Sequence, residues 1–137
     1  MKRIVAVLMC VALALCSGCA TFSNPENIAA FAQYAQATMN TAIATAQAGL
    51  ALWDAYQATV VARQTAEEQA QAAADRKALA DNIVRINTLA VQGAPLISAL
   101  LHGEGTATTW EDLNRVIMDV LTAKANSAAI VATAVAK

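Results

Sequence analysis

Small and apolar residues recur at alternating intervals of four and three positions through the first half of the chain, which is the spacing of one face of an α-helix. The positions are Ile28, Ala32, Ala35, Met39, Ala42, Ala46, Gly49, Trp53, Tyr56 and Val60. Because the pattern passes through Gly49 without interruption, we interpret Gly49 as a close-contact point within one helix. A turn at Gly49 is the alternative, and it would give four helices of similar length in a compact bundle.

The start of this first helix is predicted from local sequence. Asn24 precedes a proline, which disfavours helical backbone angles, and its side chain is suited to cap free amides. Pro25 suits the first helical position, and Glu26 is favourable beside the positive end of the helix dipole. We therefore predict that the helix begins at about residue 25.

The end of the first helix is less clearly marked. Residues 63–77 contain no large apolar residue, and they are either a solvated helical extension or the end of the helix. Neither glycine nor proline occurs there, but Asp75 is a residue type that caps new helices. We therefore predict a break near Ala74 and Asp75, with the first helix over about 25–73 and the second over about 76–101.

The second half of the chain predicts two shorter amphipathic segments. In the second helix, one face carries Leu79, Ile83, Ile86 and Ala90. Gly93-Ala94-Pro95 is predicted to kink this helix, and residues 102–109 are predicted to form a loop. Thr108 and Glu111 have capping-box spacing, which predicts a third helix over about 108–136. Its buried face is predicted to hold Leu113, Ile117, Val120 and Leu121.

Composition points to a thin bundle. Alanine supplies 32 of the 119 residues from Cys19 to Lys137, whereas glycine, proline and aromatic residues are scarce. Alanine is the strongest helix former and has little volume, so the fold class is predicted to be all-α, with little room for a ligand cavity. We expect one elongated, alanine-rich domain over residues 25–137, either a helical hairpin or a three-helix bundle.

A long first helix would have a surface that two shorter helices do not cover. Its small residues would let a partner backbone approach closely, as in a coiled coil. The candidate partner seam consists of Ala35, Ala42, Ala46, Gly49, Trp53 and Tyr56. We expect this seam to bind a second copy of the chain or another protein.

The first nineteen residues have the order of a secretory signal peptide. Two basic residues precede an unbroken apolar run over residues 4–15, and small residues follow. The run is shorter than the roughly 17–25 residues that a membrane-spanning helix needs, so we interpret it as a segment that is removed. Ser17-Gly18-Cys19 then resembles the lipobox of bacterial lipoproteins, in which two small residues precede an obligatory cysteine. Cys16 stands where that family usually has leucine.

The resemblance implies that residues 1–18 are removed and that Cys19 carries a diacylglyceryl group and a further acyl chain such as palmitate. Residues 19–24 would then form a lipidated tether, and several acyl chains on Cys19 would anchor it stably to a membrane. Ala20 is not the aspartate that retains such proteins in the inner membrane, so the periplasmic face of the outer membrane is the expected location. Ordinary secretion with cleavage after Ala20 is the alternative.

Charge and residue types limit the chemistry that we expect. The whole chain has nine basic and ten acidic residues, and removal of residues 1–18 lowers the basic count to seven, for a net charge of about −3. Without a basic block, nucleic-acid binding is not expected. His102 is the single histidine and Cys19 the single cysteine of the mature chain, so we expect neither a metal site nor a disulfide. Asp54, between two aromatic residues, is the best candidate for a buried charge with a role.

No pattern predicts a catalytic residue or a cofactor other than the lipid on Cys19. The leading hypothesis is therefore an envelope lipoprotein with a structural or adaptor role, which presents a helical surface for self-assembly or to a partner protein. The alternative is a small regulatory or exclusion lipoprotein, of the kind that a mobile element would encode, which binds and blocks an envelope protein. A small-ligand binder is the third hypothesis, and a pocket formed by Trp53, Asp54 and Tyr56 would favour it.

Overall fold

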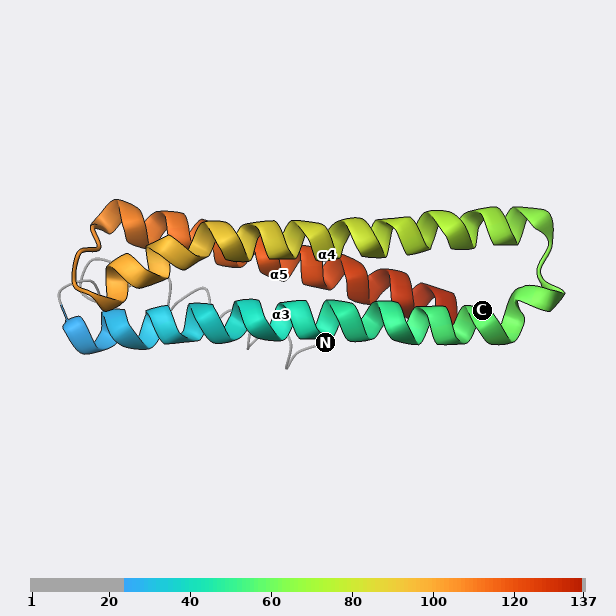
Figure 1. Cartoon of the computed structure of the whole chain (residues 1–137), viewed down its shortest axis with the longest axis horizontal. Coiled ribbons are helices and arrows are strands. Elements are labelled where there is room, and N and C mark those ends of the chain that lie inside the picture. The colour runs from blue at the N-terminus through green and yellow to red at the C-terminus, as the bar shows by residue number, and fades with distance from the viewer. Residues whose placement is uncertain (1–23, 137) are drawn as a thin grey trace, which may run out of the picture.

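Three long helices make up the fold over residues 24–136. A computed structural model describes residues 24–136, in which α3 (Pro25–Val60), a short 3₁₀ turn η1 (Val61–Arg63), α4 (Ala66–Leu101) and α5 (Ala107–Val135) follow one another. Figure 1 shows α3 and α4 as an antiparallel hairpin with α5 lying along it. A helix of 36 residues, the length of both α3 and α4, is about 54 Å long. The predicted all-α, elongated helical bundle is therefore confirmed.

The start and the middle of α3 follow the predictions. Asn24 has an extended backbone, and its Oδ1 accepts a hydrogen bond of 3.0 Å from the amide of Glu26. Pro25 occupies the first helical turn. The helix then runs through Gly49 without a break, so the alternative of four similar helices is excluded.

The predicted first helix over 25–73 and the predicted break near Ala74 and Asp75 are wrong, because α3 ends at Val60. Thr65 caps α4 instead: its hydroxyl accepts from the amide of Glu68 at 3.2 Å, and a carboxylate oxygen of Glu68 accepts from the amide of Thr65 at 2.7 Å. This reciprocal capping box satisfies two amides that would otherwise lack partners. Asp75 lies inside α4 and caps nothing.

The end of α4 agrees with the predicted boundary at residue 101. Gly93 and Pro95 do not stop the helix, which continues to Leu101. Because Pro95 has no amide hydrogen, the carbonyl of Val91 loses its helical partner, and such a loss favours bending. Figure 1 shows that the axis of α4 changes direction in its last third, the gold part of the ribbon.

The start of α5 differs slightly from the predicted helix over 108–136. Thr106, not Thr108, is the capping residue: its hydroxyl accepts from the amide of Thr109 at 3.2 Å. The hydroxyl of Thr109 accepts from the amide of Thr106 at 3.1 Å and takes the role that the prediction gave to Glu111. The spacing of a capping box is the same from either threonine, so spacing alone did not distinguish the two.

The core lies along the line where the three helices meet, with mostly alanines on α3 and mostly larger aliphatic residues on α4 and α5. The buried residues are Ala32, Ala35, Met39, Ala42, Ala46 and Trp53 of α3, Leu79, Ile86, Gly93, Ile97 and Leu100 of α4, and Leu113, Ile117, Val120, Ala123 and Ser127 of α5. Alanines on one side let the larger side chains of the other helices fill the space between the axes. Near the start of α3, Phe31 stacks on Trp110 with ring centroids 3.7 Å apart.

Two of the helices, α4 and α5, are long and apolar enough to cross a membrane by length and composition. The same composition is found in helices that build the core of a soluble bundle. The apolar character of α4 and α5 is therefore compatible with membrane association.

Candidate functional site

The predicted partner seam lies mostly inside the bundle. Ala35 and Ala42 are fully buried, and Ala46 and Trp53 are buried to within a few per cent, so none of these four is available to a partner. Gly49 and Tyr56 are half-buried and line two separate hollows. The prediction of an uncovered seam is therefore wrong for these four buried residues. Its cause is the misplaced break, since α4 is as long as an α3 that ends at Val60, and α5 covers α3 everywhere except near the hairpin tip.

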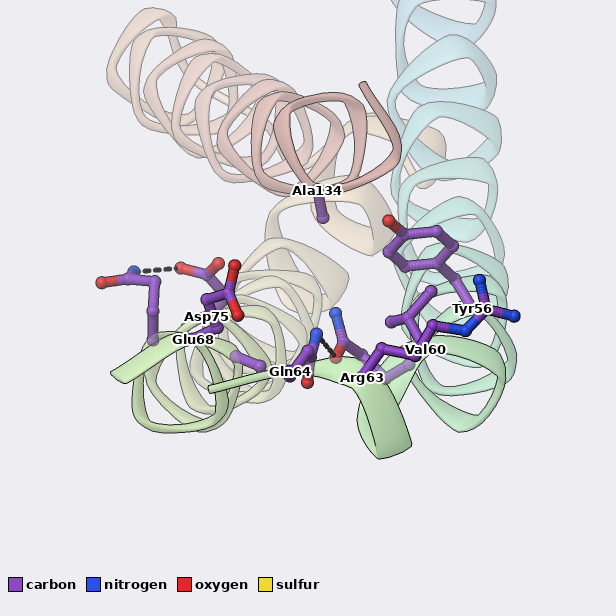
Figure 2. A pocket seen from close by; sticks show the side chains of 10 residues that line it. Tyr56, Val60, Arg63, Gln64, Glu68, Asp75 and Ala134 are labelled. Atoms are coloured by element: carbon purple, nitrogen blue, oxygen red, sulfur yellow. Dashed lines mark hydrogen bonds between the residues drawn. The ribbon is translucent and has the colours of Figure 1, made fainter. Parts of the chain in front are cut away.

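The first hollow is a cleft at the tip of the hairpin, with a volume of about 310 Å³. Figure 1 shows that α5 ends before it reaches the α3–α4 turn, so that only two helices form the tip. In Figure 2, Tyr56, Val60 and Arg63 form one wall of this tip cleft, and Glu68 and Asp75 form the opposite wall. Gln64 lies between the walls, and Ala134 of α5 closes the inner end.

The hydrogen bonds of the tip cleft leave polar groups for a ligand or a partner. The side-chain nitrogen of Gln64 donates to the side-chain oxygen of Gln57 at 2.8 Å. The side-chain nitrogen of Gln71 donates to a carboxylate oxygen of Asp75, also at 2.8 Å. The side-chain oxygen of Gln64 is buried and accepts no hydrogen bond from the described residues. Arg63 forms no ion pair with them. The cleft thus places a cation opposite carboxylates, whereas the buried oxygen of Gln64 is shielded from a ligand by the residues around it.

Asp54 is not a buried charge in an aromatic pocket. Its carboxylate pairs with the guanidinium of Arg76 on α4, at 2.8 Å from Nε to Oδ1 and 3.2 Å from Nη2 to Oδ2. Both side chains are about half exposed, at 42% for Asp54 and 54% for Arg76. The hydrogen bond and then the charge of Asp54 raise the pKa of Arg76 above its ordinary value. The ion pair joins α3 to α4 and thereby helps to hold the two helices of the hairpin together.

Trp53, beside Asp54, is 3% exposed, and its indole nitrogen has no hydrogen-bond partner among the described residues. The indole fills the core near the tip and does not line either hollow. The structure therefore does not join Trp53, Asp54 and Tyr56 into the single pocket that the ligand-binding hypothesis required.

The second hollow is an apolar groove between α3 and α5, with a volume of about 450 Å³. Its main lining residues are Ala48, Gly49 and Leu52 of α3 and Ala128, Val131 and Val135 of α5. Leu52 and Val135 are 66% and 57% exposed at its rim. Sequence spacing did not reveal this apolar groove, because its existence depends on the axial position of α5 beside α3.

His102 lies at the opposite end of the bundle from the tip cleft. It caps the C-terminal end of α4 and is exposed, with Nδ1 2.7 Å from the carbonyl oxygen of Ser98. Within residues 24–136, no group of three histidine, cysteine, aspartate or glutamate side chains is placed to hold a metal ion. The predicted lipidation site, Cys19, and the predicted signal peptide lie outside the described residues.

No protein-family model, curated protein or solved structure matches this chain. The tip cleft and the apolar groove are therefore the features from which its function is argued.

Proposed function

We propose that the chain is an envelope lipoprotein with an adaptor role, anchored through Cys19, which presents the tip of its helical hairpin to a partner protein. The lipobox-like Ser17-Gly18-Cys19 supports the anchor. Cys19 precedes α3 by only a few residues, whereas the tip cleft lies at the other end of α3, about 54 Å away. In this proposal the bundle stands upright on the membrane, with its tip well away from the lipid surface.

The tip is proposed as the binding surface because α5 ends before it and leaves a cleft of mixed charge exposed at the hairpin end. Two helices bury less apolar area than three, so a hairpin that served only to stabilise the bundle would be more stable with a third helix of equal length. Arg63 on one wall and Glu68 and Asp75 on the other offer complementary charges to a protein surface. Such charges contribute mainly to specificity and to the rate of association.

The test is photo-cross-linking in living cells with the full-length chain. A photoreactive amino acid replaces Gln71, which lines the tip cleft, and in a matched variant it replaces Gln36, an exposed residue of α3 near the predicted tether. We expect a discrete cross-linked protein from the Gln71 variant and a much weaker band from the Gln36 variant. Equal bands from both positions, or no band from Gln71, would contradict presentation of the tip.

The identity of the cross-linked species separates the remaining hypotheses. An envelope protein captured in stoichiometric amounts and unimpaired by the chain supports the adaptor role. If the captured protein loses its own activity when the chain is present, the regulatory or exclusion hypothesis replaces it. Bands of the chain with itself alone would make it a self-assembling structural lipoprotein.

A further inference from the structure

The apolar groove between α3 and α5 is lined almost entirely by apolar residues. Apart from Lys124, its polar side chains are two hydroxyls, those of Thr45 and Ser127. Thr45 donates its hydroxyl to the carbonyl of Thr41 at 2.7 Å, and Ser127 donates to the carbonyl of Ala123 at 3.1 Å. Both donors are therefore already used within their own helices. The apolar groove presents hydrocarbon along its length and no free hydroxyl donor.

One charge lies on this groove. Lys124 is half-buried at the end of the groove nearest Thr45, and it forms no hydrogen bond or ion pair with residues 24–136. No aspartate or glutamate lines the groove. Lys77, Arg76, Arg85 and Arg115, by contrast, each pair with a carboxylate. An unpaired ammonium beside an apolar surface is suited to an anionic head group whose tail is hydrocarbon.

We propose that the apolar groove binds one unbranched long-chain fatty acid, with its carboxylate on the ammonium of Lys124 and its chain directed toward Leu52 and Val135. From Lys124 to Val135 the groove extends about 16 Å along α5. An extended hydrocarbon chain advances roughly 1.3 Å per carbon for single bonds near 1.5 Å, so this length holds about 12 carbons. The volume of about 450 Å³ is within the ordinary size of small-molecule sites.

Other occupants fit the groove less well. An extended peptide would bring unpaired backbone amides and carbonyls, and the groove has no free hydroxyl to pair with them. A helix of a second copy has its backbone groups paired within itself, so the cross-linking results below distinguish that occupant. The acyl chains predicted on Cys19 are joined through ester or amide bonds, so they lack the free carboxylate that Lys124 would bind. The groove also begins about 30 Å along α3 from Pro25, away from the predicted tether. A free fatty acid satisfies both the apolar length and the charge.

The experiment uses a fatty acid of 12 to 14 carbons that carries a photoreactive diazirine in its chain and an alkyne for detection. Membranes that contain the full-length chain are irradiated with this probe, and the adducts are mapped by mass spectrometry. We expect adducts on the peptides that contain Leu52 and Val135. Excess unlabelled dodecanoate should suppress them, whereas the methyl ester of dodecanoate should suppress them several-fold less, because it has no charge.

Two pairs of variants test the head group and the tail separately. Lys124→Gln should weaken probe binding about two- to fivefold, the range for a partly exposed ion pair, whereas Lys77→Gln should leave it unchanged. Ala128→Phe should fill the groove and abolish the mapped adducts, whereas Ala129→Phe, at the neighbouring exposed position outside the groove, should not. Circular dichroism of all four variants verifies that the helices are intact.

Several results would overturn the proposal. Adducts that lie elsewhere on the chain, or equal suppression by the acid and its methyl ester, would exclude recognition of a fatty acid in this groove. Cross-links that join two copies through the groove would show that a second copy occupies it. The proposal is independent of the partner at the tip, because Gln71 cross-linking has no bearing on adducts at Leu52 and Val135.

Discussion

Replacing Gly49 and Gly93 separately by alanine tests how closely the helices pack at two points of the bundle. Both glycines lie inside long helices, where alanine is favoured over glycine by about 0.8–1.0 kcal/mol. A β-carbon on Gly49 would lie 3.6 Å from a methyl of Val131, an ordinary contact. Gly49→Ala should therefore increase the free energy of unfolding by about 1 kcal/mol.

A β-carbon on Gly93 meets a different environment. It would overlap the terminal methyl of Met39 and lie 3.0 Å from its sulfur and 3.4 Å from Val116. Met39 is 3% exposed, so its terminal methyl would have to move within the core. Overpacking of this kind costs about 1–3 kcal/mol, which exceeds or cancels the gain in helix propensity. Gly93→Ala should therefore lower the free energy of unfolding by about 0–2 kcal/mol.

Urea denaturation followed by far-ultraviolet circular dichroism measures both changes on the same chain. The double variant Gly93→Ala/Met39→Leu adds an internal control, because leucine lacks the methyl that the new β-carbon would overlap. The two changes should couple favourably by about 0.5–2 kcal/mol. If both single variants are stabilised equally, the close approach of α4 to Met39 is refuted. Absence of coupling would assign the loss to another cause.

Other predictions concern caps and core residues. Thr106→Ala should lower the free energy of unfolding by about 1 kcal/mol, whereas Thr108→Ala should not, and urea denaturation of both checks which threonine caps α5. Ile86→Ala, at a fully buried position, should cost about 2–5 kcal/mol, while Val84→Ala at 64% exposure should cost less than about 0.5 kcal/mol. Phe31→Leu should cost about 0.5–1.5 kcal/mol through loss of the ring stack and should change the fluorescence of the tryptophan that it contacts.

Local signals predicted much of the fold. The spacing of small and apolar residues identified the buried face of α3, and Asn24 and Pro25 identified its start, because these signals act within a few residues of one another. The capping box of Thr65 and Glu68 was present in the sequence as well. It is a weak signal, because no glycine or proline accompanies it and the residues around it are alanines and glutamines that suit a continuous helix.

The position of the Thr65–Glu68 capping box decides which surface of the first helix is buried. A first helix of 49 residues would exceed its neighbours and leave a seam uncovered, whereas α3 and α4 are both 36 residues long and pair along their lengths. Ala35 and Ala42 are therefore core residues. The tip cleft and the apolar groove could not be predicted, because both depend on where α5 ends and on its axial position beside α3. Such axial offsets are set by packing over the whole bundle and leave no local signal.

The central claim is that the chain is held to a membrane through a lipid on Cys19. Mass spectrometry of the N-terminal peptide of the chain purified from membranes tests it most directly. The account predicts a peptide that begins at Cys19 and carries a diacylglyceryl group and a further acyl chain. A peptide that begins at Thr21, as cleavage after Ala20 would produce, or a Cys19 without lipid, would contradict it.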